Sequence, residues 1–290
     1  MFPVTRSRAE LLCDARAELG EGPIWDVRTS ELLWVDIPPG IVHRLDPATG
    51  ADRSFELGQP VGAVVPRASG GYAFALRDGF AVGDEAGLEL VATVDGERPD
   101  MRMNDGACDP AGRFWAGTTR FDYRRAAGAL YRLDVDGGVE TMLTEVTVSN
   151  GIGWSPDGTR MYYVDTGTPR VDVFDFDVAS GAIENRRPLV TVEKGAGLPD
   201  GLVVDEEGCI WVALWDGWSA RRYSPEGELL AVVDVPVARV TKPAFGGPAL
   251  DRLFVTTALP DAPDPAQPHA GGVFVADPGV RGLPTQAYAG

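Results

Sequence analysis

The sequence predicts an all-β protein whose repeated units form a six-bladed β-propeller. Three observations lead to this fold class. A glycine recurs at intervals of 40 to 50 residues, each glycine introduces short runs rich in Val, Ile, Trp, Tyr and Phe, and turn sequences separate those runs. The recurring glycines are Gly22, Gly62, Gly106, Gly151 and Gly201, and a sixth unit starts near Ala244.

A repeat of about 40–50 residues is the length of a four-stranded propeller blade, although helical repeats share part of that range. The first unit shows the strand pattern. Its short apolar runs, Gly22–Trp25, Leu32–Asp36 and Val42–Asp46, are separated by polar, turn-forming residues and glycine. The 36 Gly and 23 Pro, and the lack of any long stretch with helical periodicity, favour strands over helices.

Later units carry turns that suit β-hairpins. Proline presets the first backbone torsion of a turn, and glycine accepts the positive φ that hairpin turns need. Four such turns lie between the predicted strands, at Asp109–Gly112, Ser155–Gly158, Asp205–Gly208 and Ser224–Gly227.

We predict that residues 1–290 form a single domain with four-stranded blades around a central channel. Six units of this length account for most of the chain. Closing the ring removes the free sheet edges that an open stack of hairpins would expose. The N-terminal segment around Leu11–Arg16 is expected to add a strand to the last blade, near Gly272–Ala276.

Composition limits the classes of partner. The formal net charge of −17 argues against nucleic acid and anionic membranes, both of which attract basic surfaces. The N-terminus lacks the apolar core of a signal peptide, and no apolar run approaches the ~18 residues of a membrane span. The scattered cysteines Cys13, Cys108 and Cys209 suggest reduced thiols, so we expect a cytoplasmic protein acting on a small molecule.

Four of the recurring glycines follow a polar residue, which is Glu21, Asp105, Asn150 or Asp200. If the repeats are blades of one ring, these side chains meet at one end of the central channel. Carboxylates that converge on one point repel each other unless a cation lies among them. Only hard oxygen donors are present, which suits Ca²⁺, Mg²⁺ or Mn²⁺.

The histidine content narrows the chemistry. The chain has only His43 and His269, and neither lies near a repeat-opening position. A Ser-His-Asp mechanism and a His-rich zinc or iron site are therefore not expected. No nucleophile elbow, P-loop or dinucleotide fingerprint occurs. General base catalysis must fall to a carboxylate, and electrophilic assistance to a metal, an arginine or an amide.

Several motifs together resemble the senescence-marker-protein / gluconolactonase / luciferin-regenerating family. They occur in family order from residue 19 to the sixth unit. The matching stretches are Leu19–Asp26, Arg102–Thr118, Gly128–Arg132, Ser149–Gly158, Leu198–Leu202 and Phe245–Pro248.

The resemblance implies a six-bladed propeller with one divalent metal on its axis. By this match Glu21, Asn150 and Asp200 are the protein ligands, and Asp200 is also the general base. Arg102 and Asn104 match the substrate-contacting pair of the family. Strict repeat register would select Asp105, but the family pattern selects Asn104, and adjacent strand residues face opposite ways unless a bulge intervenes. We expect Asn104 to face the site.

The activity that the resemblance implies is hydrolysis of a lactone, a sugar aldonolactone in the first place, to the hydroxy acid. The expected cofactor is one divalent ion, Ca²⁺ first, with Mg²⁺, Mn²⁺, Zn²⁺ and Fe²⁺ as alternatives. Hydrolysis of another electrophile, such as a phosphotriester or a secondary-metabolite lactone, is a second reading. A non-catalytic calcium- or ligand-binding propeller is a third.

Two departures from the family pattern bear on the substrate. The loop that follows Gly117 contains Asp122 where sugar lactonases of the family carry an acidic residue, but Arg124 and Arg125 accompany it. Lys242 stands where relatives have a small polar residue. We expect Asp122 and Lys242 to contact the substrate, and Lys242 could then select a carboxylate-bearing ligand.

Overall fold

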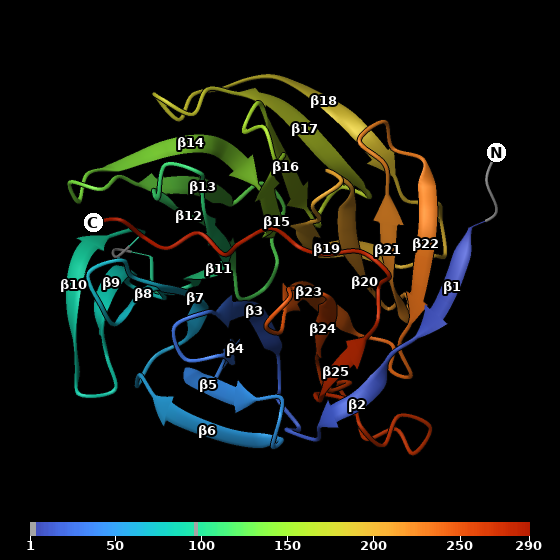
Figure 1. Ribbon diagram of the computed structural model, residues 1–290. Helices are drawn as coiled ribbons and strands as arrows, with labels where there is room; N and C mark the ends of the chain where they lie inside the picture. The colour runs from blue at the N-terminus through green and yellow to red at the C-terminus, as the bar shows by residue number, and fades with distance from the viewer. Residues whose placement is uncertain (1–3, 96–97) are drawn as a thin grey trace.

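The computed structural model of the protein describes residues 4–95 and 98–290. Twenty-five strands and no helix occur in these residues. The strands form six sheets that follow one another around a ring, so the predicted six-bladed propeller is confirmed (Figure 1). No segment in the described ranges forms a helix of the length and apolarity that crossing a membrane requires.

The first three blades are contiguous in the chain, and each runs from the channel to the outer edge in sequence order. Blade 1 consists of β3 (Gly20–Asp26), β4 (Glu31–Asp36), β5 (Ile41–Asp46) and β6 (Ala51–Glu56). Blade 2 consists of β7 (Val61–Pro66), β8 (Tyr72–Leu76), β9 (Gly79–Asp84) and β10 (Gly87–Thr93). Blade 3 consists of β11 (Met101–Cys108), β12 (Phe114–Arg120), β13 (Gly128–Leu133) and β14 (Val139–Val146).

The remaining blades follow the same plan, with the N-terminal strands added at the end. Blade 4 consists of β15 (Ser149–Trp154), β16 (Arg160–Asp165), β17 (Arg170–Phe176) and β18 (Ile183–Thr191). Blade 5 consists of β19 (Leu198–Val204), β20 (Ile210–Trp215), β21 (Ser219–Tyr223), β22 (Leu229–Asp234) and β1 (Thr5–Arg8). Blade 6 consists of β23 (Val240–Gly246), β24 (Arg252–Thr257), β25 (Val273–Ala276) and β2 (Glu10–Cys13).

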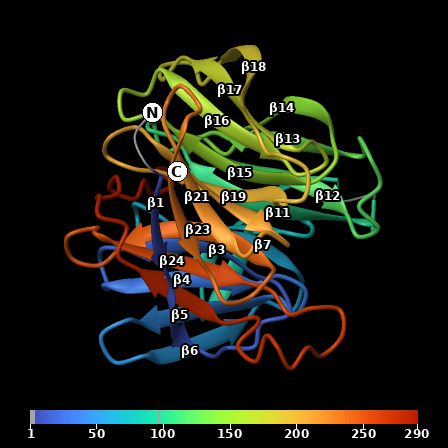
Figure 2. The same cartoon turned by 90° about the vertical axis from the view of Figure 1, so that its right-hand side faces the viewer.

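The N-terminus closes the ring, as the sequence predicted. Strand β2 pairs antiparallel with β25, with Glu10 opposite Val275 and Leu11 opposite Phe274. The preceding strand β1 also pairs, in parallel, with β22 of blade 5, and lies at the outer edge of the ring (Figure 2). Residues from the two ends of the chain therefore share one sheet, which leaves the ring without an open seam.

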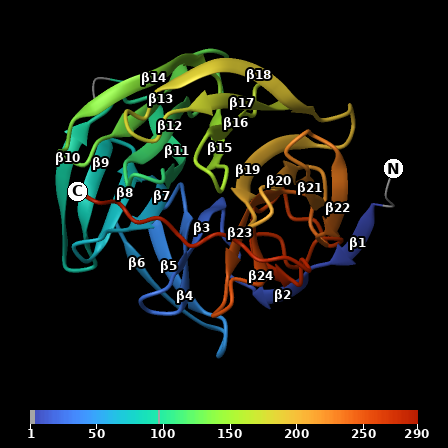
Figure 3. The ribbon, with the colours of Figure 1, turned by 45° about the horizontal axis from the view of Figure 1, so that its top comes forward.

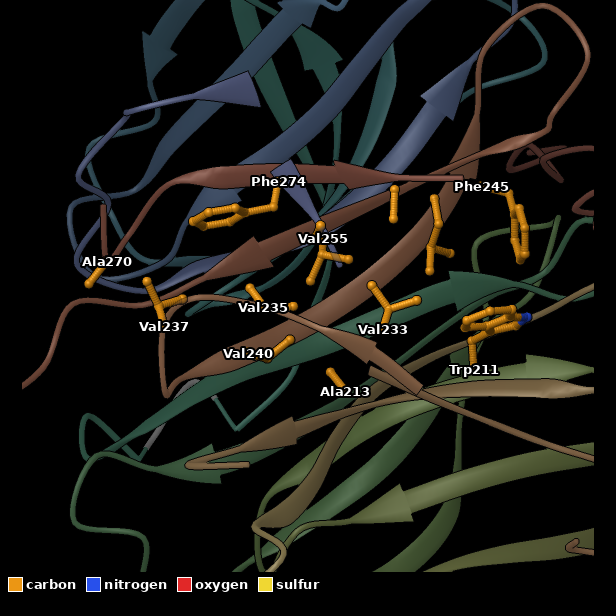
Figure 4. Close-up of a cluster of buried hydrophobic side chains, with 13 residues drawn as sticks. Trp211, Ala213, Val233, Val235, Val237, Val240, Phe245, Val255, Ala270 and Phe274 are labelled. Atoms are coloured by element: carbon orange, nitrogen blue, oxygen red, sulfur yellow. The ribbon is translucent and has the colours of Figure 1, made fainter. Parts of the chain in front are cut away.

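Apolar side chains fill the spaces between neighbouring blades. Figure 4 shows the cluster between blades 5 and 6, in which Trp211 meets Phe245 edge to face at a ring-centroid distance of 6.1 Å. Trp115 occupies a corresponding place between blades 3 and 4, packed against Trp154. These two tryptophans thus serve blade packing.

The recurring glycines lie inside the innermost strands and not at their first residues. Each inner strand passes the backbone of the next blade closely. A Cβ atom built on Gly62 would lie 2.0 Å from the carbonyl oxygen of Asn104, and one on Gly151 would lie 2.7 Å from the amide nitrogen of Leu202. Backbone fills the space that a side chain would need at these two positions, so glycine permits the close approach of the blades there.

The C-terminal segment, residues 277–290, crosses one face of the ring from blade 6 toward blade 2 (Figure 3). Gly282 forms an isolated β-bridge with Asp205, and Tyr288 forms one with Arg67. The buried Tyr288 donates a hydrogen bond from its hydroxyl to the carbonyl oxygen of Asp134 at 2.9 Å. The segment therefore closes the channel end at which the inner strands finish.

Candidate metal centre and substrate cavity

The first residues of the inner strands meet at the opposite end of the channel and line a cavity of about 330 Å³. That volume is within the range of small-molecule sites. Five residues of the predicted site line it, namely Glu21, Arg102, Asn104, Asn150 and Asp200. The structure therefore brings together the three expected ligands and two of the four expected substrate contacts.

A common irregularity orients these side chains. In each of the six inner strands the pairing with the second strand shifts register at or next to the channel-facing residue. Such β-bulges turn the strand and re-aim side chains. In β11 the shift lies between Met103 and Gly106, so both Asn104 and Asp105 are buried, and Asn104 faces the cavity as the family pattern predicted.

A chain of hydrogen bonds links the polar side chains on the cavity floor. Arg102 donates from Nη1 to Oδ1 of Asn104 at 2.5 Å, and Asn104 donates from Nδ2 to Oδ1 of Asn150 at 2.9 Å. Asn150 donates from Nδ2 to the hydroxyl of Thr166 at 2.8 Å, which donates to the carbonyl oxygen of Pro199 at 2.8 Å. These bonds turn the carbonyl oxygen of Asn150 toward the other site residues. Sequence reasoning missed Thr166, which lies just past the end of β16.

The two candidate carboxylates are buried close together. Burial and the negative charge of Asp105 raise the pKa of Glu21 to about 8. Burial, and then the charge of Glu21, raise the pKa of Asp200 well above its ordinary range. Oδ1 of Asp200 is inaccessible to solvent and has no hydrogen-bond partner. An unsatisfied carboxylate oxygen of this kind is costly unless a cation or proton accompanies it.

The donor set fits a hard divalent cation. Glu21 and Asp200 offer carboxylate oxygens, and Asn150 offers an amide oxygen, which are the ligand types of Ca²⁺, Mg²⁺ and Mn²⁺. Within residues 4–95 and 98–290, no three His, Cys, Asp or Glu side chains gather closely enough to hold a metal on their own. The amide of Asn150 is therefore a necessary part of the candidate centre.

Lys242 does not line this cavity. It lies at the register shift of β23, at the position that Gly151 holds in β15 and Gly201 in β19, and its buried ammonium pairs with the carboxylate of Asp105. Gly201 makes room for it, because a Cβ atom there would lie 2.4 Å from Cβ of Lys242. The side chain lines a second cavity at the other end of the channel. The structure thus places Lys242 beneath the cavity floor, away from the expected substrate contact.

Asp122 also lies outside the cavity lining. Its carboxylate accepts two hydrogen bonds from Arg120, at 2.8 and 2.9 Å, and these lower the pKa of Asp122 to about 2. The next residue, Tyr123, lines the cavity instead, with a left-handed backbone at φ 53°. No local sequence signal distinguished Tyr123 from Asp122, because the orientation depends on how Arg120 anchors the loop.

The residues that line the cavity form two layers, because side chains alternate in direction along a strand. Side chains two residues apart on a strand point the same way. Leu19, Arg102, Val148 and Leu198 stand two residues before Glu21, Asn104, Asn150 and Asp200, and all eight line the cavity. The earlier residues therefore form the layer nearer the mouth, and Trp215, at the end of β20, completes that layer opposite Leu198.

Comparison with known proteins identifies the family of the chain. The model of the SMP-30/Gluconolactonase/LRE-like region matches residues 19–259 of the chain. Regucalcin of Danio rerio is 38% identical over 291 residues, which cover 98% of this chain and 99% of that protein.

Solved structures show the same fold. The calcium-binding protein regucalcin of Agrobacterium tumefaciens superposes with a TM-score of 0.93 at 30% identity, over 99% of both chains. A luciferin-regenerating enzyme superposes with a TM-score of 0.88 at 33% identity, over 94% of this chain and 96% of that one. The family match covers all the residues that line the cavity. The chain therefore belongs to the SMP-30/Gluconolactonase/LRE-like family.

Proposed function

We propose that this protein is a metal-dependent lactonase that hydrolyses a lactone to the corresponding hydroxy acid. The observation that carries the proposal is the buried, unpartnered Oδ1 of Asp200 in a cavity shared with Glu21, Asn150 and Arg102. In such a cavity the carboxylate can act as a general base, and the guanidinium can stabilise the oxyanion that develops during hydrolysis. Membership of a family whose description includes gluconolactonase supports this reaction class.

Glu21, Asn150 and Asp200 are the residues that would hold the cation. A bound divalent ion would act as a Lewis acid that polarises the lactone carbonyl. We place Ca²⁺ first, since the Agrobacterium relative is described as calcium-binding. Mg²⁺, Mn²⁺, Zn²⁺ and Fe²⁺ are the alternatives to be compared, because oxygen ligands alone discriminate weakly among hard ions.

Different side chains would carry out the proton transfer and stabilise the developing charge. Asp200 would accept a proton from the attacking water and return it to the ring oxygen that leaves as an alcohol. Arg102 would donate hydrogen bonds to the carbonyl oxygen as negative charge develops on it. Asn104 lies between Arg102 and Asn150 in the hydrogen-bond chain, so it would also fix the directions of the donor and the ligand.

Release of acid at constant pH measures the reaction directly. The protein stripped of metal should be inactive toward a panel of lactones, and a divalent ion should restore turnover. Glucono-1,5-lactone is the reference sugar lactone, and an organophosphate triester tests the second reading of the site. Turnover of the triester but of no lactone, with any of the ions, would replace the lactonase proposal with that reading.

A calcium-binding role without catalysis is the second candidate, which the calcium-binding relative favours. In that case the protein should bind Ca²⁺ through Glu21 and Asp200 but turn over no lactone. Calorimetric titration of the stripped protein, run beside the activity panel, separates the two functions. Binding together with turnover supports the lactonase, and binding with a silent panel supports the calcium-binding role.

We also propose a cytoplasmic location. The structure leaves Cys13, Cys108 and Cys209 unpaired, as the sequence suggested. Buried free thiols are usual in reducing compartments, where disulfides are rare. Fractionation of cells that produce the protein, followed by immunodetection, would test this location.

A further inference from the structure

We infer that the preferred substrates are lactones carrying an alkyl or aryl substituent, in place of polyhydroxylated sugar lactones. This inference rests on the proposed lactonase function and specifies its substrate class. It follows from the contrast between the polar floor of the cavity and its apolar upper layer.

Apolar side chains occupy most of the layer nearer the mouth. Of the four residues that stand two positions before the floor residues, Leu19, Val148 and Leu198 are aliphatic, and Arg102 is polar. The indole of Trp215 extends the same surface. A substituent on the lactone ring would lie against this layer when the carbonyl is at the floor, because the two layers are adjacent along each strand.

Leu198 and Trp215 form an exposed pair that a substrate could cover. They stand opposite each other on β19 and β20, and Leu198 is 44% exposed. The guanidinium of Arg239 lies 4.8 Å from the ring centroid of Trp215 and is held by Asp261 at 2.7 Å. The cation–π contact restricts the orientation of the indole, so the apolar surface is preorganised for a ligand.

The polar groups around the cavity are largely engaged with one another. Thr166 accepts a bond from Asn150 and donates to Pro199, and the amide nitrogen of Asn104 already serves Asn150 and Ser149. A sugar lactone carries a hydroxyl on nearly every ring carbon. Each hydroxyl buried without a partner costs roughly 5- to 150-fold in affinity.

The acidic residue expected to bind sugar hydroxyls faces elsewhere. Asp122 is tied to Arg120 by two hydrogen bonds and is absent from the cavity lining. Tyr123 lines the cavity in its place, with its hydroxyl near the guanidinium of Arg102. The loop therefore supplies an aromatic side chain and no carboxylate for a polyol.

A series of δ-lactones with one ring and different substituents tests the inference. We would measure kcat/KM of the metal-loaded enzyme for δ-valerolactone, δ-hexalactone, δ-octalactone, δ-decalactone and glucono-1,5-lactone. Each value is divided by the hydroxide-catalysed rate constant of the same lactone, which removes differences in intrinsic reactivity. The corrected kcat/KM should rise about fourfold for each methylene buried and then level off, since burial of a methylene is worth ~0.8 kcal/mol.

Two matched variants assign the effect to the cavity layer. Leu198→Ser should lower the ratio of corrected kcat/KM for δ-decalactone over δ-valerolactone by several-fold. Leu90→Ser removes a similarly exposed leucine, 50% accessible, from the outer strand β10, and should leave the ratio unchanged. Circular dichroism and thermal melting establish that both variants are folded before the ratios are compared.

The outcomes separate the two proposals. A rising series that Leu198→Ser flattens supports the substrate class. Turnover that is highest for glucono-1,5-lactone after correction, or equal across the series, overturns the substrate class and leaves the lactonase standing. If no lactone is turned over with any of the ions, the lactonase proposal itself is overturned.

Discussion

The ammonium of Lys242 pairs with the carboxylate of Asp105 on the propeller axis, and both side chains are buried beneath the floor of the candidate metal site. In the sixth blade Lys242 stands where blades 4 and 5 have Gly151 and Gly201, and its side chain extends into the channel. Asp105 adds a third carboxylate to Glu21 and Asp200, and the lysine offsets its charge. The pair therefore belongs to the scaffold of the site.

Replacing Lys242 with methionine should destabilise the protein by about 3–5 kcal/mol, because Asp105 would be left buried without its counter-charge. Equilibrium denaturation in urea measures the free energy of unfolding. The double variant with Asp105→Asn should recover much of the loss, since it removes the charge as well. If Lys242→Met alone unfolds at the wild-type urea concentration, the pair contributes nothing to the fold.

The pKa of Glu21 predicts how pH and metal act together on stability. Its folded-state pKa of about 8 exceeds the ordinary 4.5, so the metal-free folded state binds the proton more tightly than the unfolded state does. This contribution to stability is complete below about pH 4.5 and is lost as the pH rises through about 8. A cation needs the ionised carboxylate, so its stabilising effect should grow over the same range.

Thermal melting in EDTA and in saturating Ca²⁺, from pH 5 to pH 9, checks this linkage. The difference in Tm between the two conditions should widen as the pH rises. Glu21→Gln has no titrating group at this position and should show a smaller difference with a flatter pH profile. A wild-type difference that stays constant with pH would contradict the assignment of Glu21 as a ligand.

Asp200→Asn should reduce kcat by about 10²–10⁴-fold toward any lactone that the wild type hydrolyses, because the amide cannot accept the proton from water. Cation affinity should fall as well, since one ligand loses its charge. The exposed Asp122→Asn is the matched control and should retain near-wild-type kcat. A full loss of activity in Asp122→Asn with little change in Asp200→Asn would reverse the two roles.

Gly62→Ala tests the close approach of blades at the axis. The added methyl would clash with the backbone of Asn104 in the next blade, and overpacking of this kind costs about 1–3 kcal/mol. Gly87 has open space around its Cβ direction and no positive φ, so Gly87→Ala is the control that should not destabilise the fold. Urea midpoints of the two variants should differ clearly; equal midpoints would mean that the blades can separate to admit a side chain.

Much of the fold and of the candidate metal centre could be predicted from the sequence. The period of the glycines, the turn residues and the apolar runs are local properties, and they indicated six blades and the closing N-terminal strand. Glu21, Asn150 and Asp200 could be paired with one another because equal positions in a closed repeat meet at one place. The family resemblance then selected Asn104 over Asp105, which repeat register alone would have reversed.

Other features depend on how the strands pair and on which side chains they bring into contact. The direction of Asn104 depends on the register shift between β11 and β12. The position of Lys242 depends on the space beside Gly201 and on a carboxylate 137 residues away in the chain. Tyr123 lines the cavity, and Asp122 does not, because Arg120 holds that carboxylate outside it.

The sequence by itself thus determined the blades and the residues that can supply oxygen donors, since strand alternation and turn chemistry act between near neighbours. Only the tertiary structure decided which of the neighbouring polar side chains face the cavity and that aliphatic residues and Trp215 surround its mouth. The physical reason is that a side chain's direction and burial are set by the strand paired with it and by the blade packed against it. Neither the register shift between paired strands nor the packing of the next blade is visible as a local pattern in the sequence.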